Sequence, residues 1–274
     1  MKQKKDYKKI WLAAGIVCAA AAVIAVCYII NDTMRRRDTA SAYEEMASET
    51  NAVPDSIPET ETGTETGAEA LRPEIHVEIP EKNLDWEALH EESEDIYAWI
   101  YVPDTDIDYP VFQHPTDNSY YLNHNIDGTE GYPGCIYTED YNAKDFSDTH
   151  TVLYGHNLKD GTMFTSLHNF EDSDLFEKDH YIFIYTEDYA FAYQIFAAYE
   201  YSKIHLLDNF DYSNQYVYEN YLKSIYDTED QGANIRLDIP VAADDQIITL
   251  STCTAEHDAE QRYLVTGVLL NPRT

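Results

Sequence analysis

The sequence predicts a mainly β fold, a barrel or sandwich with inserted helices, preceded by one N-terminal transmembrane helix. From residue 84 onward, short segments rich in β-branched and aromatic residues follow one another, separated by Pro, Gly and Asp. Few segments in that part have the spacing of an amphipathic helix. Near the N-terminus, a single run of 21 residues carries no charge. Many short strands with few helices are typical of barrels and sandwiches.

The charge balance limits the kinds of partner that the protein can bind. The chain has 274 residues, of which 44% are hydrophobic and 13% aromatic, enough for a substantial core. It carries 18 Lys and Arg against 51 Asp and Glu, a net charge of -33. Eight of the 18 basic residues lie within the first 37 positions, so the rest of the chain is strongly acidic. Because a nucleic-acid partner needs a basic surface, we expect no nucleic-acid binding.

The uncharged run over residues 10–30 has the length of a membrane span. At a helical rise of about 1.5 Å per residue it is about 30 Å long, the thickness of a bilayer's hydrocarbon core. Trp11 and Tyr28 lie near its ends, where interfacial aromatic residues are found. The alternative, a cleaved signal peptide, has an apolar region of about 7–15 residues with its cleavage site just behind it. We expect an uncleaved single-pass anchor in the cell membrane, with a cytoplasmic N-terminus because five lysines precede the run and three arginines follow it.

The segment after the anchor has the composition of a spacer. Glu, Thr, Pro and Gly dominate its centre, which lacks aromatic residues and any apolar period, so it cannot bury enough surface to offset chain entropy. Repulsion between its like charges should extend it. We expect a cytoplasmic basic tail, a transmembrane anchor, an acidic disordered spacer and a folded domain, over residues 1–9, 10–30, 31–80 and 81–274 respectively.

The folded domain is expected to begin with a short helix and to continue mainly as strands. Asp85 can cap a helix over residues 85–93, in which two apolar side chains share one face. Apolar residues at i, i+3, i+4 and i+7 predict an amphipathic helix over residues 211–227, and residues 169–179 form a helical or turn-like segment. The predicted strands cover residues 96–102, 109–113, 134–138, 149–155, 181–185, 189–199, 246–252 and 261–270.

One cysteine stands where a predicted strand leaves the sheet. Of the four cysteines, Cys18 and Cys27 lie in the apolar run, and we expect no structural disulfide between Cys135 and Cys253. A core cysteine is usually inert, but Cys253 follows the predicted strand 246–252 and precedes a polar loop. A strand end can present a reactive side chain on a rigid base, so Cys253 is the candidate nucleophile.

Two further residues are candidates to act with Cys253. Arg262 begins the next predicted strand, so the two positions face each other across a hairpin. From the hairpin alone, a surface ion pair explains this arginine equally well, with Glu256, Asp258 or Glu260 as the partner. Another apolar strand runs into Gly155 and then His156, and histidine is the usual base beside a thiol.

The sequence contains no recognisable motif for a metal or a cofactor. It has no HExxH, no paired CxxC, no Walker loop and no GxGxxG in a strand–helix unit. We therefore expect no resident metal and no cofactor. The acidity of the chain leaves an adventitious calcium site as the one alternative.

Three motifs taken together resemble the sortases, the membrane-anchored cysteine transpeptidases of Gram-positive bacteria. TLSTC at residues 249–253 matches the family pattern TLxTC, Arg262 follows behind a loop, and YGHN at 154–157 lies upstream, in the order and spacing of the family. The resemblance covers roughly residues 84–272. Three features are similar to class B of the family: the continuation YGHNLKDGTMF at 154–164, the sequence YLNHN at 121–125 and the predicted helix over residues 211–227. The lid motif of class C is absent from the sequence.

The resemblance implies a closed eight-stranded sortase-type β-barrel with peripheral helices, and it gives each motif a role. Cys253 would be the nucleophile, His156 the acid and base, and Arg262 the group that stabilises the oxyanion or holds the substrate. The substrate groove would be lined by Asn123, Tyr154, Ser251 and Thr252, with Tyr199 as a further candidate.

The implied reaction is cleavage of a C-terminal sorting signal after Thr, followed by transfer of the acyl product to a peptidoglycan amine. The implied partners are secreted proteins with an NPxTx-like sorting signal, a peptidoglycan precursor amine and, through the anchor, the membrane. The catalytic domain would be extracellular. Three alternatives stay open: a thiol protease that hydrolyses the same type of motif, a pilin-polymerising sortase, and a non-enzymatic anchored binding module in which these residues are incidental.

Overall fold

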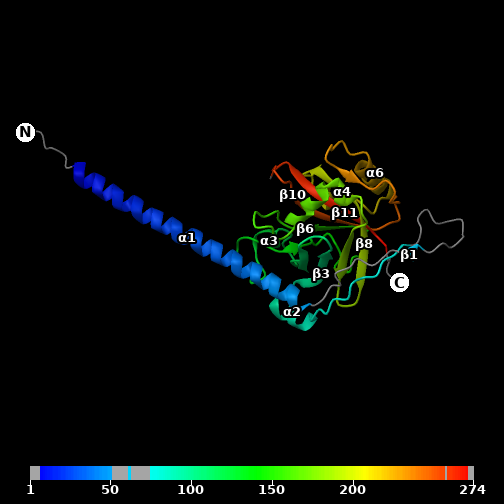
Figure 1. The fold of residues 1–274 in the computed structure, drawn as a ribbon, viewed down its shortest axis with the longest axis horizontal. Helices are drawn as coiled ribbons and strands as arrows, with labels where there is room; N and C mark the ends of the chain where they lie inside the picture. The colour runs from blue at the N-terminus through cyan, green and yellow to red at the C-terminus, as the bar shows by residue number, and fades with distance from the viewer. Residues whose placement is uncertain (1–6, 51–60, 63–74, 257, 271–274) are drawn as a thin grey trace, which may run out of the picture. The chain divides into compact units, whose positions relative to one another are not determined.

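The computed structural model describes residues 7–50, 61–62, 75–256 and 258–270. The chain divides into two compact units, Met1–Ala42 and Tyr43–Thr274. Helix α1 (Tyr7–Glu49) makes up the described part of the first unit and ends within the second unit, which contains the strands (Figure 1).

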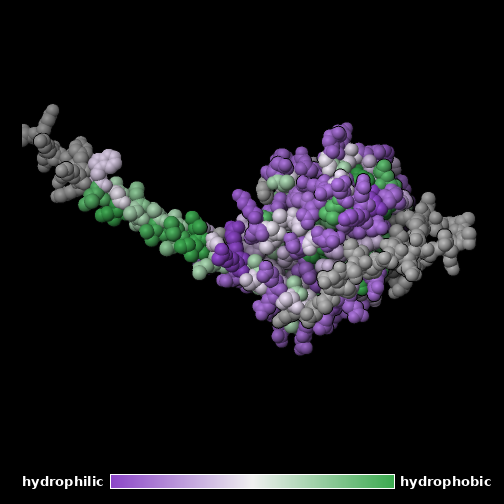
Figure 2. Space-filling view, in the orientation of Figure 1, coloured by the Kyte–Doolittle hydropathy of each residue, from purple (hydrophilic) through white to green (hydrophobic). Residues whose placement is uncertain are grey.

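Helix α1 carries the uncharged run that is predicted to span a membrane. One stretch of it is long and apolar enough for a span, with a mean hydropathy of 2.3, and is not buried. Hydrophobic side chains cover this stretch in Figure 2. The sequence predicts a disordered spacer from residue 31, but residues 31–49 continue the helix, because they contain no Pro or Gly and many good helix formers. The Pro- and Gly-rich centre of the predicted spacer and residues 1–6 of the predicted tail lie outside the described residues.

The last turn of α1 is packed into the second unit. Tyr43 is 3% exposed, and its hydroxyl donates to the Gly134 carbonyl at 2.9 Å. Thr50 is also buried, and its hydroxyl accepts a hydrogen bond from Lys82 Nζ at 2.9 Å. The folded unit therefore begins near Tyr43 rather than at the predicted boundary, residue 81.

Eight strands close into the barrel that the resemblance predicts. Hydrogen-bonded neighbours run in the order β11-β10-β6-β5-β4-β3-β7-β8, and β8 pairs with β11 to close the ring. The eight strands are β3 (Ile96–Val102), β4 (Ile107–Phe112), β5 (Ile136–Tyr137), β6 (His150–Tyr154), β7 (Tyr181–Tyr185), β8 (Ala190–Ser202), β10 (Ile247–Cys253) and β11 (Gln261–Leu269). The short β9 (Asn234–Ile235) adds to β8, and β1 (Glu61–Thr62) pairs with β2 (Ile75–His76) apart from the barrel.

Short helices lie between the strands and end where capping residues allow. The predicted helix at 85–93 is α2, and Asp85 accepts from the Ala88 N–H at 3.1 Å as its cap. The predicted helix at 211–227 is α6, capped by Asn214 and buried along its apolar face. The helices are α2 (Trp86–Glu92), α3 (Tyr120–Asn123), η1 (Thr165–Glu171), α4 (Ser173–Phe176), α5 (Leu206–Asn209) and α6 (Gln215–Tyr226).

Alternating apolar side chains fill the barrel. One hydrophobic cluster inside the ring contains fully buried side chains from β4, β6 and β10, namely Val111, Leu153 and Leu250. A second cluster lies between the barrel wall and α6, where Tyr218 and Ile225 are fully buried. Each such side chain contributes about 1.5–3 kcal/mol of stability, so the strand ends are anchored on a rigid base.

One strand pairing sets the position of the site. Strands β6 and β10 are parallel, with Ser251 opposite Tyr154. The Gly155 N–H continues the ladder and donates to the Ser251 carbonyl at 3.1 Å. Because parallel strands end at the same edge of a sheet, the residues that follow both strands meet at one edge of the barrel.

Candidate active site

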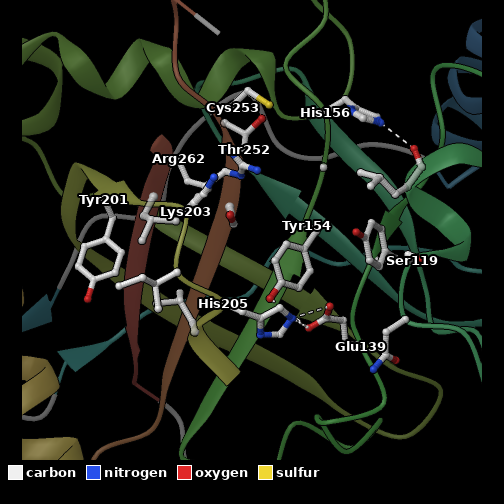
Figure 3. Close-up of a pocket in the computed structure, with 18 of the residues that line it drawn as sticks. Ser119, Glu139, Tyr154, His156, Tyr201, Lys203, His205, Thr252, Cys253 and Arg262 are labelled. Atoms are coloured by element: carbon white, nitrogen blue, oxygen red, sulfur yellow. Dashed lines mark hydrogen bonds and ion pairs between the residues drawn. The ribbon is translucent and has the colours of Figure 1, made fainter. Parts of the chain in front are cut away.

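The parallel register of β6 and β10 sets the positions of Cys253 and His156. Each lies two residues beyond one member of the Tyr154–Ser251 pair, so each leaves its strand at the same edge of the barrel. In Figure 3 the Cys253 thiol and the His156 imidazole stand at the same mouth of a groove. Cys253 is partly exposed, and its thiol is free. The structure therefore brings together two candidate residues that are far apart in the sequence.

Gly155 is required by the close packing behind His156. A Cβ at this position would lie 2.5 Å from Ile136 Cδ1 and 2.7 Å from the Phe164 ring. Real Cβ atoms do not approach other atoms so closely, so any side chain here would displace the end of β6. Glycine thus allows the backbone that carries His156 to lie directly against the core.

Arg262 faces Cys253 from the next strand. The two residues are register partners at the loop end of the β10–β11 hairpin. The Arg262 guanidinium donates to the Gln261 carbonyl at 2.7 Å and, among the described residues, forms no ion pair with a carboxylate. Of the three candidate partners, Glu260 instead pairs with Lys203 at 2.7 Å. The described geometry therefore leaves Arg262 directed to the groove (Figure 3) rather than to a surface ion pair.

His156 is held as a neutral base by its surroundings. Its Nε2 lies 2.7 Å from the Leu122 carbonyl, and its ring packs edge-on against Tyr132 at 4.9 Å. A carbonyl oxygen can only accept, so Nε2 carries the proton and Nδ1 is the basic nitrogen. Burial lowers the pKa of His156 below its ordinary value of 6.5, although the Leu122 carbonyl opposes this. The imidazole is therefore neutral at pH 7.

The groove has a volume of about 420 Å³ and is lined by most of the predicted binding residues. Tyr154, Ser251 and Thr252 form part of its wall together with Cys253, His156 and Arg262. The Thr252 hydroxyl is buried and has no hydrogen-bond partner among the described residues. Because this oxygen is buried, the Thr252 hydroxyl lies behind the groove surface and supports the end of β10.

Two of the predicted groove residues lie elsewhere. Asn123 has an exposed side chain outside the groove lining, whereas Asn118 and Leu122 of the same segment do line it. Tyr199 is 1% exposed in the core, and Tyr201 lines the groove instead. For Asn123 the resemblance pointed to a segment that reaches the groove through Asn118 and Leu122, and for Tyr199 it pointed to a strand that reaches the groove through Tyr201.

The groove also contains an ionisable pair that the sequence does not indicate. His205 Nε2 lies 2.9 Å from the Glu139 carboxylate, and the Tyr154 hydroxyl donates to Glu139 Oε2 at 3.2 Å (Figure 3). Burial beside this carboxylate raises the pKa of Tyr154, so its hydroxyl stays protonated. Glu139 and His205 stand in separate connecting segments with no motif around either residue, so only the fold brings them together.

No metal centre accompanies these residues. Among the residues that the structure describes, no group of three or more His, Cys, Asp or Glu side chains is arranged to hold a metal ion. The four cysteines, all of them described, are free thiols.

A closed eight-stranded barrel with a cysteine, a histidine and an arginine at one groove is the architecture of a barrel-based cysteine transpeptidase. A sequence profile described as Sortase domain matches residues 100–270, more than half of the chain. The chain belongs to the sortase family, and its relatives place it in class B.

The relatives are sortases of class B in both sequence and structure. The chain is 34% identical over 180 residues to sortase B of Listeria monocytogenes, covering 65% of this chain and 71% of that protein. It is 30% identical over 184 residues to sortase B of Staphylococcus aureus, covering 66% of this chain and 72% of that protein. A crystal structure of Clostridium perfringens sortase B aligns with a TM-score of 0.60 at 29% identity, over 68% of this chain and 99% of that one. A Bacillus anthracis sortase B complex aligns with a TM-score of 0.65 at 26% identity, over 86% of this chain and 98% of that one.

Proposed function

We propose that the protein is a membrane-anchored transpeptidase that cleaves a C-terminal sorting signal after Thr and joins the acyl product to a peptidoglycan amine. The observation that carries this proposal is the convergence of Cys253 and His156 at the ends of two parallel strands, with Arg262 facing Cys253 across the hairpin. Membership of the sortase family supports the reaction type. A solved Staphylococcus aureus sortase B–substrate complex is a structural neighbour, at a TM-score of 0.59 and 28% identity.

The first half of the reaction forms a thioester. The neutral Nδ1 of His156 takes the proton of the Cys253 thiol, and the thiolate attacks the carbonyl carbon of the scissile Thr. Negative charge develops on the carbonyl oxygen, and the Arg262 guanidinium stabilises it. When the C–N bond breaks, His156 returns the proton to the leaving amine, and the acyl group remains on sulfur.

The second half of the reaction transfers the acyl group. An incoming amine attacks the thioester carbonyl while His156 Nδ1 accepts a proton from the amine. The tetrahedral intermediate again places its charge beside Arg262, and collapse releases the Cys253 thiolate and a new amide. The lowered pKa of His156 suits this step, because the base must be neutral when the amine arrives.

The groove offers both polar and apolar contacts for a peptide. Tyr154 and Ser251 lie along one wall. Leu122 and Ile204, 38% and 47% exposed, provide apolar contacts on the lining. A peptide with alternating polar and apolar side chains, such as an NPxTx-like signal, suits this mixture. The apolar stretch of α1 supports the anchor, with an extracellular catalytic unit.

The test is turnover of an NPxTx-like peptide with and without an amine acceptor. We expect Cys253→Ala to abolish cleavage while the protein melts as the wild type does, since the Cys253 side chain is partly exposed and supports little packing. Cys135→Ala is the matched control: this thiol is 1% exposed and is not among the groove-lining residues, so turnover should persist with some loss of stability. Full activity of Cys253→Ala would refute the proposal.

The products distinguish the proposed reaction from its rivals. A transpeptidase gives the amide of the added amine, whereas a thiol protease gives the free acid whether or not the amine is present. Transfer to the side-chain amine of a pilin subunit, in preference to a peptidoglycan amine, would indicate pilus assembly. A binding module would release no product in either assay.

A further inference from the structure

The backbone carbonyl of Cys253 is held by side chains that the proposed reaction does not use. His168 Nε2 lies 3.0 Å from this oxygen, and Asn157 Nδ2 donates to it at 3.4 Å and to the Thr254 carbonyl at 3.2 Å. On its other side, His168 Nδ1 is 2.5 Å from Glu171 Oε1. We call Asn157, His168 and Glu171 the Cys253 clamp.

The His168 imidazole bridges Cys253 and Glu171. The Cys253 carbonyl oxygen only accepts, so the hydrogen bond at this oxygen takes its proton from His168 Nε2. His168 Nδ1 lies 2.5 Å from the Glu171 carboxylate, so the ring is held on both sides. Asn157 Nδ2 lies 3.1 Å from the same Nε2 and adds a third contact.

Removal of the His168 side chain would take away the shorter of the two side-chain contacts to the Cys253 carbonyl. Asn157 Nδ2, at 3.4 Å, would remain. The position of the Cys253 strand end therefore depends on His168.

The clamp also connects Cys253 to His156. Asn157 directly follows His156 in the chain. The loop that carries both residues is tied back on itself, since the Phe164 N–H donates to the His156 carbonyl at 2.9 Å and the Leu158 N–H donates to Thr165 Oγ1 at 2.7 Å. A shift of the Cys253 carbonyl relative to Asn157 is thus a shift of the thiol relative to the imidazole.

The His168 ring is packed as well as hydrogen-bonded. It stacks on Tyr263 of β11, with ring centroids 4.7 Å apart. Contacts from η1 and from β11 therefore hold the ring in one orientation behind the Cys253 carbonyl.

We propose that His168 is a positioning residue of the sortase reaction: held by Glu171, it fixes the Cys253 carbonyl and, together with Asn157, sets the thiol against His156. The inference rests on the proposed function, in which Cys253 is the nucleophile and His156 the base. It adds a histidine that touches neither the substrate nor the reacting atoms.

The test compares full-length His168→Leu, His168→Gln and Glu171→Gln in peptide turnover. His168→Leu removes both contacts, so we expect kcat to fall about 10- to 100-fold with little change in KM, the scale for misplaced reacting groups. His168→Gln keeps one N–H donor and should recover part of that loss. Glu171→Gln keeps a hydrogen-bonding group beside His168 Nδ1, so it should cost less turnover than His168→Leu. His90→Gln is the matched control, because His90 also contacts a backbone carbonyl, that of Ile96 at 3.1 Å, but lies on α2 outside the groove lining.

The rate of Cys253 alkylation by iodoacetamide gives a readout independent of transpeptidation. We expect it to change in His168→Leu and not in His90→Gln, with thermal melting as the check on folding. The inference is overturned if both His168 variants turn over within twofold of wild type, or if Cys253 in His168→Leu is alkylated at the wild-type rate. An active Cys253→Ala variant would instead overturn the proposed function itself, so the two failures are distinct.

Discussion

His150 makes the stability of the barrel sensitive to acid. This residue of β6 is 2% exposed, and its Nε2 lies 2.8 Å from Thr249 Oγ1. Its Nδ1 is buried without a hydrogen-bond partner among the described residues, and the rings of Tyr212 and Tyr221 pack beside it. No carboxylate compensates a charge here, so burial lowers the pKa of His150 from 6.5 to about 3.

The size of the effect follows from these two pKa values. Below pH 6.5 the unfolded chain takes up a proton at His150 while the folded protein does not, so unfolding becomes more favourable as the pH falls. The stabilising contribution is complete above pH 6.5 and is lost progressively down to about pH 3. Each pH unit in this window corresponds to about 1.4 kcal/mol, so going from pH 7 to pH 5 should lower the free energy of unfolding by about 2 kcal/mol through His150 alone.

The assay is urea unfolding of the purified protein between pH 5 and pH 7, compared with His150→Gln. Glutamine keeps an N–H donor for Thr249 but does not titrate, so the variant should lose about 2 kcal/mol of the pH dependence whatever its stability at pH 7. His90→Gln, on the surface helix α2, should keep the wild-type slope. The same pH dependence in His150→Gln and wild type would show that His150 is not a buried neutral histidine.

Three further predictions concern the site and the domain boundary. Arg262→Lys keeps the charge but loses the planar fork of donors, so turnover should fall about 10²–10³-fold with unchanged melting; turnover within a few-fold of wild type would exclude a role at the oxyanion. Gly155→Ala places a Cβ within 2.7 Å of Ile136 and Phe164, so it should destabilise the protein by about 1–3 kcal/mol and reduce turnover about 10²-fold; wild-type activity would show that His156 tolerates the shift. A truncated protein that begins at residue 81 should be about 3–5 kcal/mol less stable than one that begins at residue 43, because it lacks the buried Tyr43. Equal midpoints of urea unfolding for the two proteins would show that the folded domain begins at residue 81.

Local patterns were enough to predict a mainly β fold, a barrel or a sandwich, and the bounds of several strands. Strands such as 96–102 and 181–185 were predicted at their observed bounds, because β-branched and aromatic residues there are bounded by turn residues. Cys253, His156 and Arg262 were predicted as site residues from their places at strand ends and from the motifs around them, and the structure brings all three to one groove. The closure of the barrel came from the resemblance and is confirmed by the β8–β11 pairing.

The features that the sequence did not reveal depend on contacts between distant segments. Tyr43 lies in a polar stretch and is buried only because Gly134, far along the chain, accepts its hydrogen bond. Glu139 and His205 meet across the groove from two connecting segments. His168 has no strand-end position and gains its significance only when η1 lies behind Cys253. Local sequence patterns do not encode such long-range contacts, so they become visible only in the folded structure.

The parallel pairing of β6 with β10 has a consequence for how this site can vary and when it forms. The relative position of His156 and Cys253 is fixed by the ladder at Tyr154 and Ser251, not by the length of chain between them. Insertions or deletions within the surface segments that connect these strands can therefore change the groove walls while leaving the reacting pair in register. The same ladder joins residues far apart in sequence, so it closes late in folding. Cys253 and His156 therefore come together only after these two strands have paired.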